Sequence, residues 1–121
     1  MPSNREQAVP PMNNKPEMPD HLGALAQAEW NRMLTVMAEV LTEYDGPALA
    51  AYCIAYGRWK DAEQNIQKFG TVVRSKDNDK PAPNPYLAIS DKAQEVMQRW
   101  LAELRCTPKS RASVKAEAGC I

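Results

Sequence analysis

The chain has 121 residues, of which 44% are hydrophobic and 25% are charged, the size and composition of one ordinary globular domain. Fifteen Lys and Arg residues balance fifteen Asp and Glu residues, which argues against a monomer that binds nucleic acid through overall positive charge. The sequence contains no apolar run that could cross a bilayer and no signal-peptide stretch near its start, so we expect an intracellular protein without a membrane partner.

Prolines are concentrated at the start of the chain, where residues 2–19 hold five of the ten. The rest of this stretch is rich in Asn and other polar side chains, a composition that cannot bury enough apolar surface to order itself. We therefore predict a flexible arm over residues 1–18, followed by a helical core domain over 19–105 and a short basic element with a tail over 106–121.

The first helix is predicted from about Asp20 to Leu41, with Asp20 as its N-cap. Apolar side chains recur here at three- and four-residue steps and form one wide face. Gly23 is expected to weaken only the first turn of this helix.

The second helix is predicted to begin after a capping box, in which Thr42 is the N-cap and Asp45 the acid three residues later. Pro47 is tolerated in a first turn, and Gly70 after Phe69 is a typical residue just beyond a helix end. Because the link between the first two helices is short, we expect them to pack as an antiparallel hairpin.

Residues 71–84 have the composition of turns and loops, which predicts an exposed excursion or a small hairpin closed by Asn84-Pro85. A third helix is predicted from Pro85 or Ser90 to Arg105. Thr107-Pro108 then repeats the start signal of a helix and predicts a short fourth one. The expected fold class is all-α: a helical hairpin, a third long helix and a short C-terminal helix.

Each predicted long helix carries one tryptophan on its apolar face: Trp30, Trp59 and Trp100. We interpret them as the seam of one shared core, and an aromatic binding platform is the alternative. Cys53 is expected in the same core.

No catalytic centre is visible in the sequence. The chain lacks phosphate-binding glycine motifs and the H-E-x-x-H zinc motif, and its one histidine and three scattered cysteines do not form a ligand pattern. Asp45 is a cap rather than an acid catalyst, and Ser110 and Ser113 have no histidine nearby in sequence. We therefore predict a protein that is not an enzyme and that holds no cofactor and no metal.

The order and spacing of several features resemble the small subunit of phage terminase, the DNA-recognition and regulatory part of the packaging machinery of tailed phages. The resemblance covers about residues 16–113, and its strongest element is the closing T-P-x-S-R after a leucine. Its carriers are Leu22, Ala28-Glu29-Trp30, Leu41-Thr42, Asp45, Leu49, Tyr52-Cys53, Trp59, Gly70, Val72-Val73, Asn84-Pro85, Trp100, Leu104 and Thr107-Pro108-x-Ser110-Arg111.

Two positions depart from the pattern of that family. Arg105-Cys106 stands where such sequences have a leucine-glycine before the Thr-Pro, so a different helix end is expected there. The N-terminal arm keeps its prolines, but its only basic residues are Arg5 and Lys15, whereas the arm of the family is more basic.

The resemblance implies a helical protomer that assembles into a homo-oligomeric ring in the host cytoplasm, binds double-stranded viral DNA at the packaging-initiation site and presents it to the terminase large subunit. The large subunit holds the ATPase and the nuclease, and the small subunit regulates both without catalysis of its own. Ring assembly would repeat a weak basic patch around a symmetry axis and so raise its avidity. Apolar residues available for the subunit contacts are Tyr44, Ile54, Tyr86 and Leu87. The alternative is that these four are ordinary surface or partly buried core residues.

Two clusters of basic residues are the candidate DNA contacts, through phosphates rather than bases. The first lies in an acid-free segment and comprises Arg105, Lys109, Arg111 and Lys115. The second comprises Lys68, Arg74, Lys76 and Lys80. Ordinary solvated surface is the alternative for each residue. For the whole chain, the alternative is a small helical adaptor that binds another protein and no nucleic acid; a helix-turn-helix regulator is disfavoured by the long link between helices two and three.

Overall fold

The computed structural model describes residues 15–106. Within this range the chain forms the helices α2 (Ala24–Val36), α3 (Gly46–Phe69) and α4 (Tyr86–Glu103), a 3₁₀ turn η1 (Glu43–Asp45) and the short strands β1 (Val72–Arg74) and β2 (Pro81–Pro83). The predicted all-α class is confirmed. Most of the predicted arm and the predicted fourth helix lie outside the described residues.

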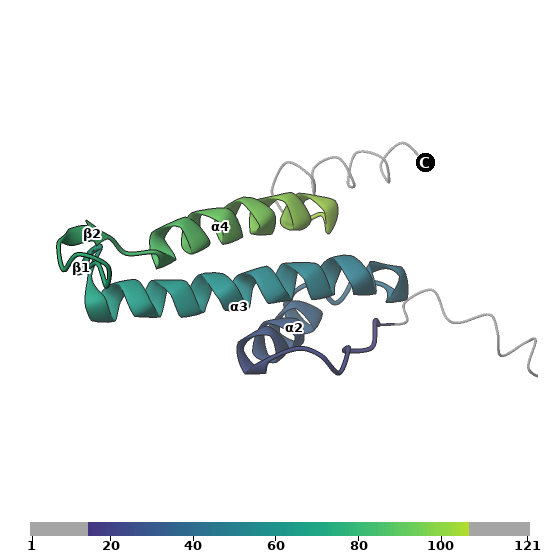
Figure 1. Cartoon of the computed structure of the whole chain (residues 1–121). Coiled ribbons are helices and arrows are strands. Elements are labelled where there is room, and N and C mark those ends of the chain that lie inside the picture. The colour runs from purple at the N-terminus through teal and green to yellow at the C-terminus, as the bar shows by residue number, and fades with distance from the viewer. Residues whose placement is uncertain (1–14, 107–121) are drawn as a thin grey trace, which may run out of the picture.

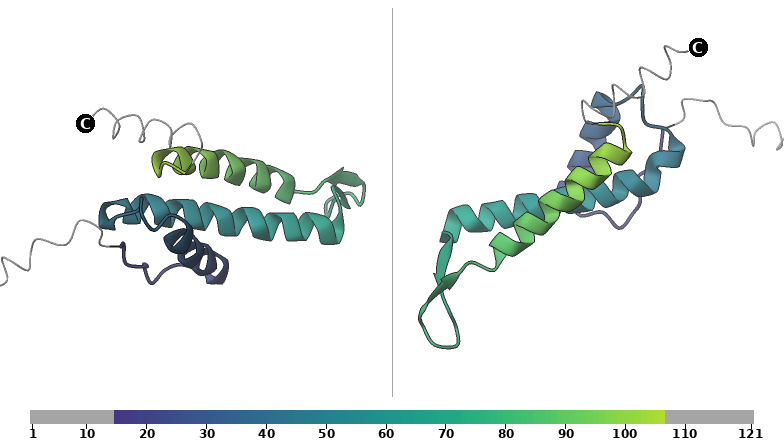
Figure 2. Two further views of the ribbon diagram at one scale, coloured as in Figure 1. Left: turned by 180° about the vertical axis from the view of Figure 1, so that it is seen from behind. Right: turned by 90° about the horizontal axis from the view of Figure 1, so that it is seen from above.

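The antiparallel pair of helices is α3 with α4 rather than the first two helices. α4 runs back along α3 over most of its length, whereas α2 lies across the other side of α3 (Figure 1). The two further views show the same arrangement (Figure 2). The predicted pairing of the first two helices is replaced because the turns at 37–40 and η1 redirect the chain before α3 begins. The β1–β2 hairpin is the connection that reverses the chain.

α2 is shorter at both ends than the sequence predicted. Gly23, not Asp20, is its N-cap, with an extended backbone and no side-chain cap, and the helix ends before Met37. Met37 and Leu41 remain buried, but they belong to a turn in which the amides of Val40 and Leu41 both donate to the Met37 carbonyl. The apolar stripe therefore continues past the helix because turn residues also pack into the core.

The predicted capping box is present and leads directly into α3. The Thr42 amide donates to Asp45 Oδ2 at 2.9 Å, and the Tyr44 amide donates to Thr42 Oγ1 at 3.3 Å. Gly46 and Pro47 follow as the first residues of α3, where a proline costs no helical hydrogen bond. Asp45 thus has the structural role expected of it.

The core lies where α2, the start of α3 and the end of α4 meet. Trp30, Leu49, Cys53 and Leu104 are all at most 1% exposed. Trp100 is half-buried and packs against this core, but Trp59 is not part of it. Trp59 instead lies beside Tyr56, with ring centroids 5.8 Å apart. The predicted seam of three tryptophans is therefore wrong for Trp59, which lies farther along α3 than the core residues Leu49 and Cys53.

The predicted small hairpin between the second and third helices is confirmed. β1 and β2 pair antiparallel, with Val72 opposite Pro83 and Arg74 opposite Pro81. Gly70 ends α3 at φ 87°, a conformation that glycine adopts without strain. Buried Asn84 ties the hairpin down: its Nδ2 donates to the Gly70 carbonyl and to Asn65 Oδ1, and its Oδ1 accepts from the Tyr86 amide.

The residue after the last turn of α4 has a left-handed backbone conformation that is usually taken by glycine, although here it is an arginine. Arg105 has φ 62°, its amide donates to the Ala102 carbonyl, and the Cys106 amide donates to the Leu101 carbonyl. These two bonds define a Schellman motif, which normally takes glycine at the position of Arg105. Whether this helix end differs from that of chains with leucine-glycine at positions 105 and 106 stays a prediction.

Candidate functional site

The described members of the two predicted DNA-contacting clusters lie at opposite ends of the α3–α4 pair (Figure 1). Arg105 is exposed and follows the last turn of α4. Lys109, Arg111 and Lys115 lie outside the described residues. The second cluster is at the opposite end, on the last turn of α3 and on the hairpin (Figure 1). Because α3 alone has 24 residues and rises about 1.5 Å per residue, Arg105 and the second cluster do not form one patch on a single protomer.

All four residues of the second cluster are exposed: Lys68, Arg74, Lys76 and Lys80. Arg74 is held on the hairpin, with its Nη1 2.8 Å from the Asp79 carbonyl and 3.4 Å from Asp79 Oδ2. The Lys68 ammonium lies 5.3 Å from the centre of the Phe69 ring, a distance typical of a cation–π contact. Lys76 and Lys80 project from the turn that joins the strands, where Asp77 and Asp79 offset part of their charge.

A buried polar cluster that the helical periodicity does not predict joins α2 to α3. Glu29 is 2% exposed and accepts two hydrogen bonds from the Arg32 guanidinium, at 2.7 and 2.6 Å. The buried Tyr52 hydroxyl of α3 also donates to Glu29. The one available signal was an acid within the apolar stripe of α2, three residues before an arginine.

The cluster stabilises the packing of the helices and does not provide a nucleophile. Burial, and then the Glu29 carboxylate, raise the pKa of the Cys53 thiol to about 12, so the thiol stays protonated and unreactive at neutral pH. Burial also raises the pKa of Tyr52, and the hydrogen bond to Glu29 adds to that rise. The bond to Glu29 raises the pKa of Arg32 as well. Within residues 15–106 no group of His, Cys, Asp and Glu is arranged to hold a metal ion.

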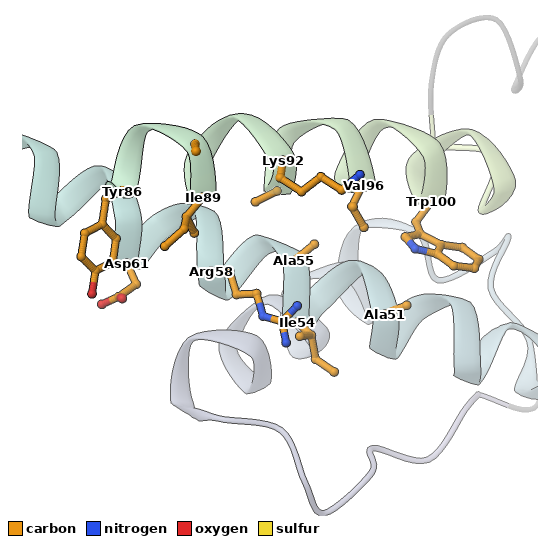
Figure 3. A pocket seen from close by; sticks show the side chains of 12 residues that line it. Ala51, Ile54, Ala55, Arg58, Asp61, Tyr86, Ile89, Lys92, Val96 and Trp100 are labelled. Carbon is orange, nitrogen blue, oxygen red and sulfur yellow. The ribbon is translucent and has the colours of Figure 1, made fainter. Parts of the chain in front are cut away.

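A groove between α3 and α4 has a volume of about 850 Å³. Ala51, Ile54 and Ala55 line it from α3, and Ile89 and Val96 line it from α4 (Figure 3). Trp100 and Tyr86 stand at its two ends, and Arg58, Asp61 and Lys92 supply polar groups along its length (Figure 3). A groove with such an apolar lining is suited to binding an extended or helical peptide segment.

Two of the four apolar residues that we expected at subunit contacts, Ile54 and Tyr86, line this groove. Leu87 is half-buried. Tyr44 is 84% exposed and lies on η1 at the start of α3, whereas Phe69 and Val72, 57% and 61% exposed, lie at the other end of α3. Exposed apolar side chains are thus present at both ends of the long helix.

The fold and these surfaces define a small helical protein built on one long antiparallel helix pair, with exposed basic groups at its ends. No helix of the described part is both long and apolar enough to cross a membrane. Residues 26–120 match the family model described as "Phage terminase, small subunit". The match covers well over half of the chain, so the chain belongs to this family and has a role in phage DNA packaging.

Members of this family are in general the regulatory subunit of terminase rather than the catalytic one. No curated protein and no solved structure matches the chain.

Proposed function

We propose that this chain binds double-stranded viral DNA at the packaging-initiation site as an oligomeric ring and regulates the ATPase and nuclease of the terminase large subunit. The chain itself would have no catalytic activity, and it would act in the host cytoplasm. Membership of the small-subunit family over residues 26–120 is the observation that carries the proposal.

The charge distribution supports binding by an assembly rather than by a single chain. The net charge is zero, and the candidate DNA-contacting cations that the structure describes are divided between the two ends of the α3–α4 pair (Figure 1). Copies arranged around an axis would repeat both basic ends around that axis, and the summed phosphate contacts would then provide the affinity that one patch lacks.

The exposed apolar residues support a closed assembly. Tyr44 lies at one end of α3 and Phe69 and Val72 lie at the other, so a contact between the two ends would join two different surfaces. Contacts between unlike surfaces generate rings when the rotation closes. This is the type of interface that the proposed ring requires.

Salt-dependent DNA binding tests the phosphate contacts. We expect the double substitution Lys109→Ala/Arg111→Ala to weaken duplex binding. It should also reduce the slope of log affinity against log salt, by about 0.9 for each DNA phosphate that the variant chain no longer neutralises. Lys76→Ala/Lys80→Ala should act in the same direction but less, because Asp77 and Asp79 already offset part of the charge there.

Lys60→Ala/Lys92→Ala is the matched control, since it removes the same charge from the middle of α3 and α4. If all three double variants bind with the affinity and the salt slope of the parent chain, neither cluster contacts DNA. Equal losses in all three would show a response to net charge alone.

The apolar groove favours a second candidate function, that of a helical adaptor that binds a protein segment and no DNA. The same titration separates the two: an adaptor would show no duplex binding even in dilute buffer, where phosphate attraction is strongest.

A further inference from the structure

The groove between α3 and α4 continues into a second hollow near the N-terminal end of α3. Ala51 and Ile54 line both hollows. The second is also lined by Pro16, Glu17 and Pro19, the first described part of the chain. Pro16 is buried, and its side chain packs against Gly46 of α3: a Cβ added at Gly46 would lie 3.5 Å from Pro16 Cβ. The N-terminal segment therefore already lies in the extension of the groove.

The residues that precede this point have the composition and the length to fill the groove. Ala8-Val9-Pro10-Pro11-Met12 is an uninterrupted apolar run. Five residues in the extended polyproline conformation span roughly 15 Å. The part of α3 that lines the groove, from Ala51 to Asp61, covers about the same length at about 1.5 Å per residue.

The lining matches this kind of segment in its chemistry. Proline-rich segments bind in grooves that present aromatic side chains, because their backbone is ordered at little entropic cost. Trp100 and Tyr86 provide an aromatic side chain at each end of the groove (Figure 3).

The attachment at Pro16, near Ala51 and Ile54, sets the direction of binding. If Met12 lies near Trp100, which is at the Ala51 end, the chain runs toward Tyr86 and brings Glu6 and Arg5 beyond the apolar run. Arg58, Lys92 and Asp61 are the charged groups along the groove, and Glu6 and Arg5 would lie past them, outside the apolar contact.

We propose that residues 8–12 of each chain bind in the α3–α4 groove of the same chain. Attachment at Pro16 holds the segment next to the groove at a high effective concentration, which favours its own groove over that of a second copy. The groove is then covered within each protomer, and the ends of α3 remain available for contacts between subunits.

Site-specific photo-cross-linking on the full chain tests this proposal. Benzoylphenylalanine is placed at Val9 in one variant and at Ser3 in a control. Unlabelled and ¹⁵N-labelled chains are mixed in denaturant, refolded together and irradiated. We expect position 9 to cross-link to peptides that contain Ile54, Ile89 or Val96. Each product should join two segments of the same chain, so no product should combine a labelled with an unlabelled peptide. Position 3 should give far less of these products.

A second variant shows whether the groove itself is responsible. Ile89 is 43% exposed, so Ile89→Asp leaves the core intact. It should lower the groove cross-links by about fivefold, because a charged side chain replaces an apolar one in the lining. Gln98→Asp, an exposed substitution on the same helix outside the groove, should leave them unchanged.

Three results would overturn the proposal: cross-links from position 9 that are spread over the surface, the same yield in Ile89→Asp, or products that join labelled to unlabelled chains. The last result would assign the groove to a second copy of the chain. No arm of the experiment contains DNA, so its outcome is independent of whether the chain binds duplex.

Discussion

Arg105 is in a left-handed backbone conformation that its side chain disfavours. A residue with a Cβ loses about 1–2 kcal/mol there relative to the right-handed conformation, and glycine does not. We therefore expect Arg105→Gly to stabilise the protein by about 1 kcal/mol in chemical denaturation, with part of the gain offset by the freer unfolded chain.

Arg105→Ala is the control for the charge. It removes the guanidinium but keeps the Cβ, so it should give little or none of this stabilisation. A gain from alanine equal to that from glycine would show that charge, not backbone strain, sets the cost at this position. In the DNA account both variants bind duplex more weakly, which would explain why an arginine is kept at a strained position.

The raised pKa of Cys53 makes the stability depend on alkaline pH. The pKa of this thiol is about 12 in the folded protein, against an ordinary value of 9.0. Between about pH 9 and pH 12 the unfolded chain loses this proton while the folded chain keeps it, so the free energy of unfolding falls as the pH rises, by up to about 1.4 kcal/mol per pH unit. Below about pH 9 the thiol is protonated in both states, so it causes no loss in the free energy of unfolding.

Urea denaturation at a series of pH values from 8 to 11 measures this slope. Cys53→Ala should show a shallower decline than the parent chain, whatever its stability at neutral pH. Tyr52 contributes in the same direction at higher pH, because its pKa is also raised, so some decline should persist. Parallel curves for the two proteins would contradict the assignment to Cys53.

At the scale of the elements, Asn84 holds the hairpin to the helix pair. Its side chain makes three hydrogen bonds while only 3% exposed, so Asn84→Ala removes the partner of two partly buried backbone groups, the Gly70 carbonyl and the Tyr86 amide. We expect a loss of about 2–3 kcal/mol in the free energy of unfolding, together with faster amide hydrogen exchange in β1 and β2.

Asn78→Ala is the matched control, because the Asn78 side chain accepts one bond, from the Lys80 amide on the exposed turn. It should cost well under 1 kcal/mol, as surface substitutions commonly do. If Asn84→Ala leaves hydrogen exchange in the hairpin at the parental rate, the hairpin is held by its own strand pairing and not by this anchor.

The elements with local signals were predictable from the sequence. The Thr42–Asp45 box predicted the turn η1 that leads into α3, Gly70 predicted the end of α3, and turn chemistry predicted the 71–84 hairpin. The ends of α2 were not predictable, because Met37 and Leu41 continue the apolar stripe through a turn. Periodicity records burial, and residues outside a helix can also be buried.

The tertiary partners were less accessible to sequence reasoning than the elements. A short link suggested that the first two helices pair, but the direction of the chain through residues 37–45 was decided by turns whose geometry the sequence does not specify. The groove was unpredictable for the same reason, since it depends on which faces of α3 and α4 meet. The two basic clusters could be recognised in the sequence. That they lie at opposite ends of the helix pair could be seen only in the structure.

At the scale of the whole molecule, a neutral chain with divided basic groups contacts DNA strongly only when several copies act together. A single protomer presents Arg105 at one end and the Lys68–Lys80 cluster at the other, so few of its cations can reach one stretch of duplex. Repetition around an axis changes this, because affinities of linked contacts multiply when their geometry allows simultaneous binding. An assembly of several copies therefore reconciles the zero net charge of this chain with the packaging role of its family.

Native mass spectrometry of the full chain, with and without viral duplex DNA, tests this claim most directly. We predict a single closed oligomer of defined copy number, and a further species of that oligomer with one duplex bound that disappears as the ammonium acetate concentration is raised. A chain that stays a single copy at high concentration, and that carries no duplex in the most dilute buffer, would contradict the account.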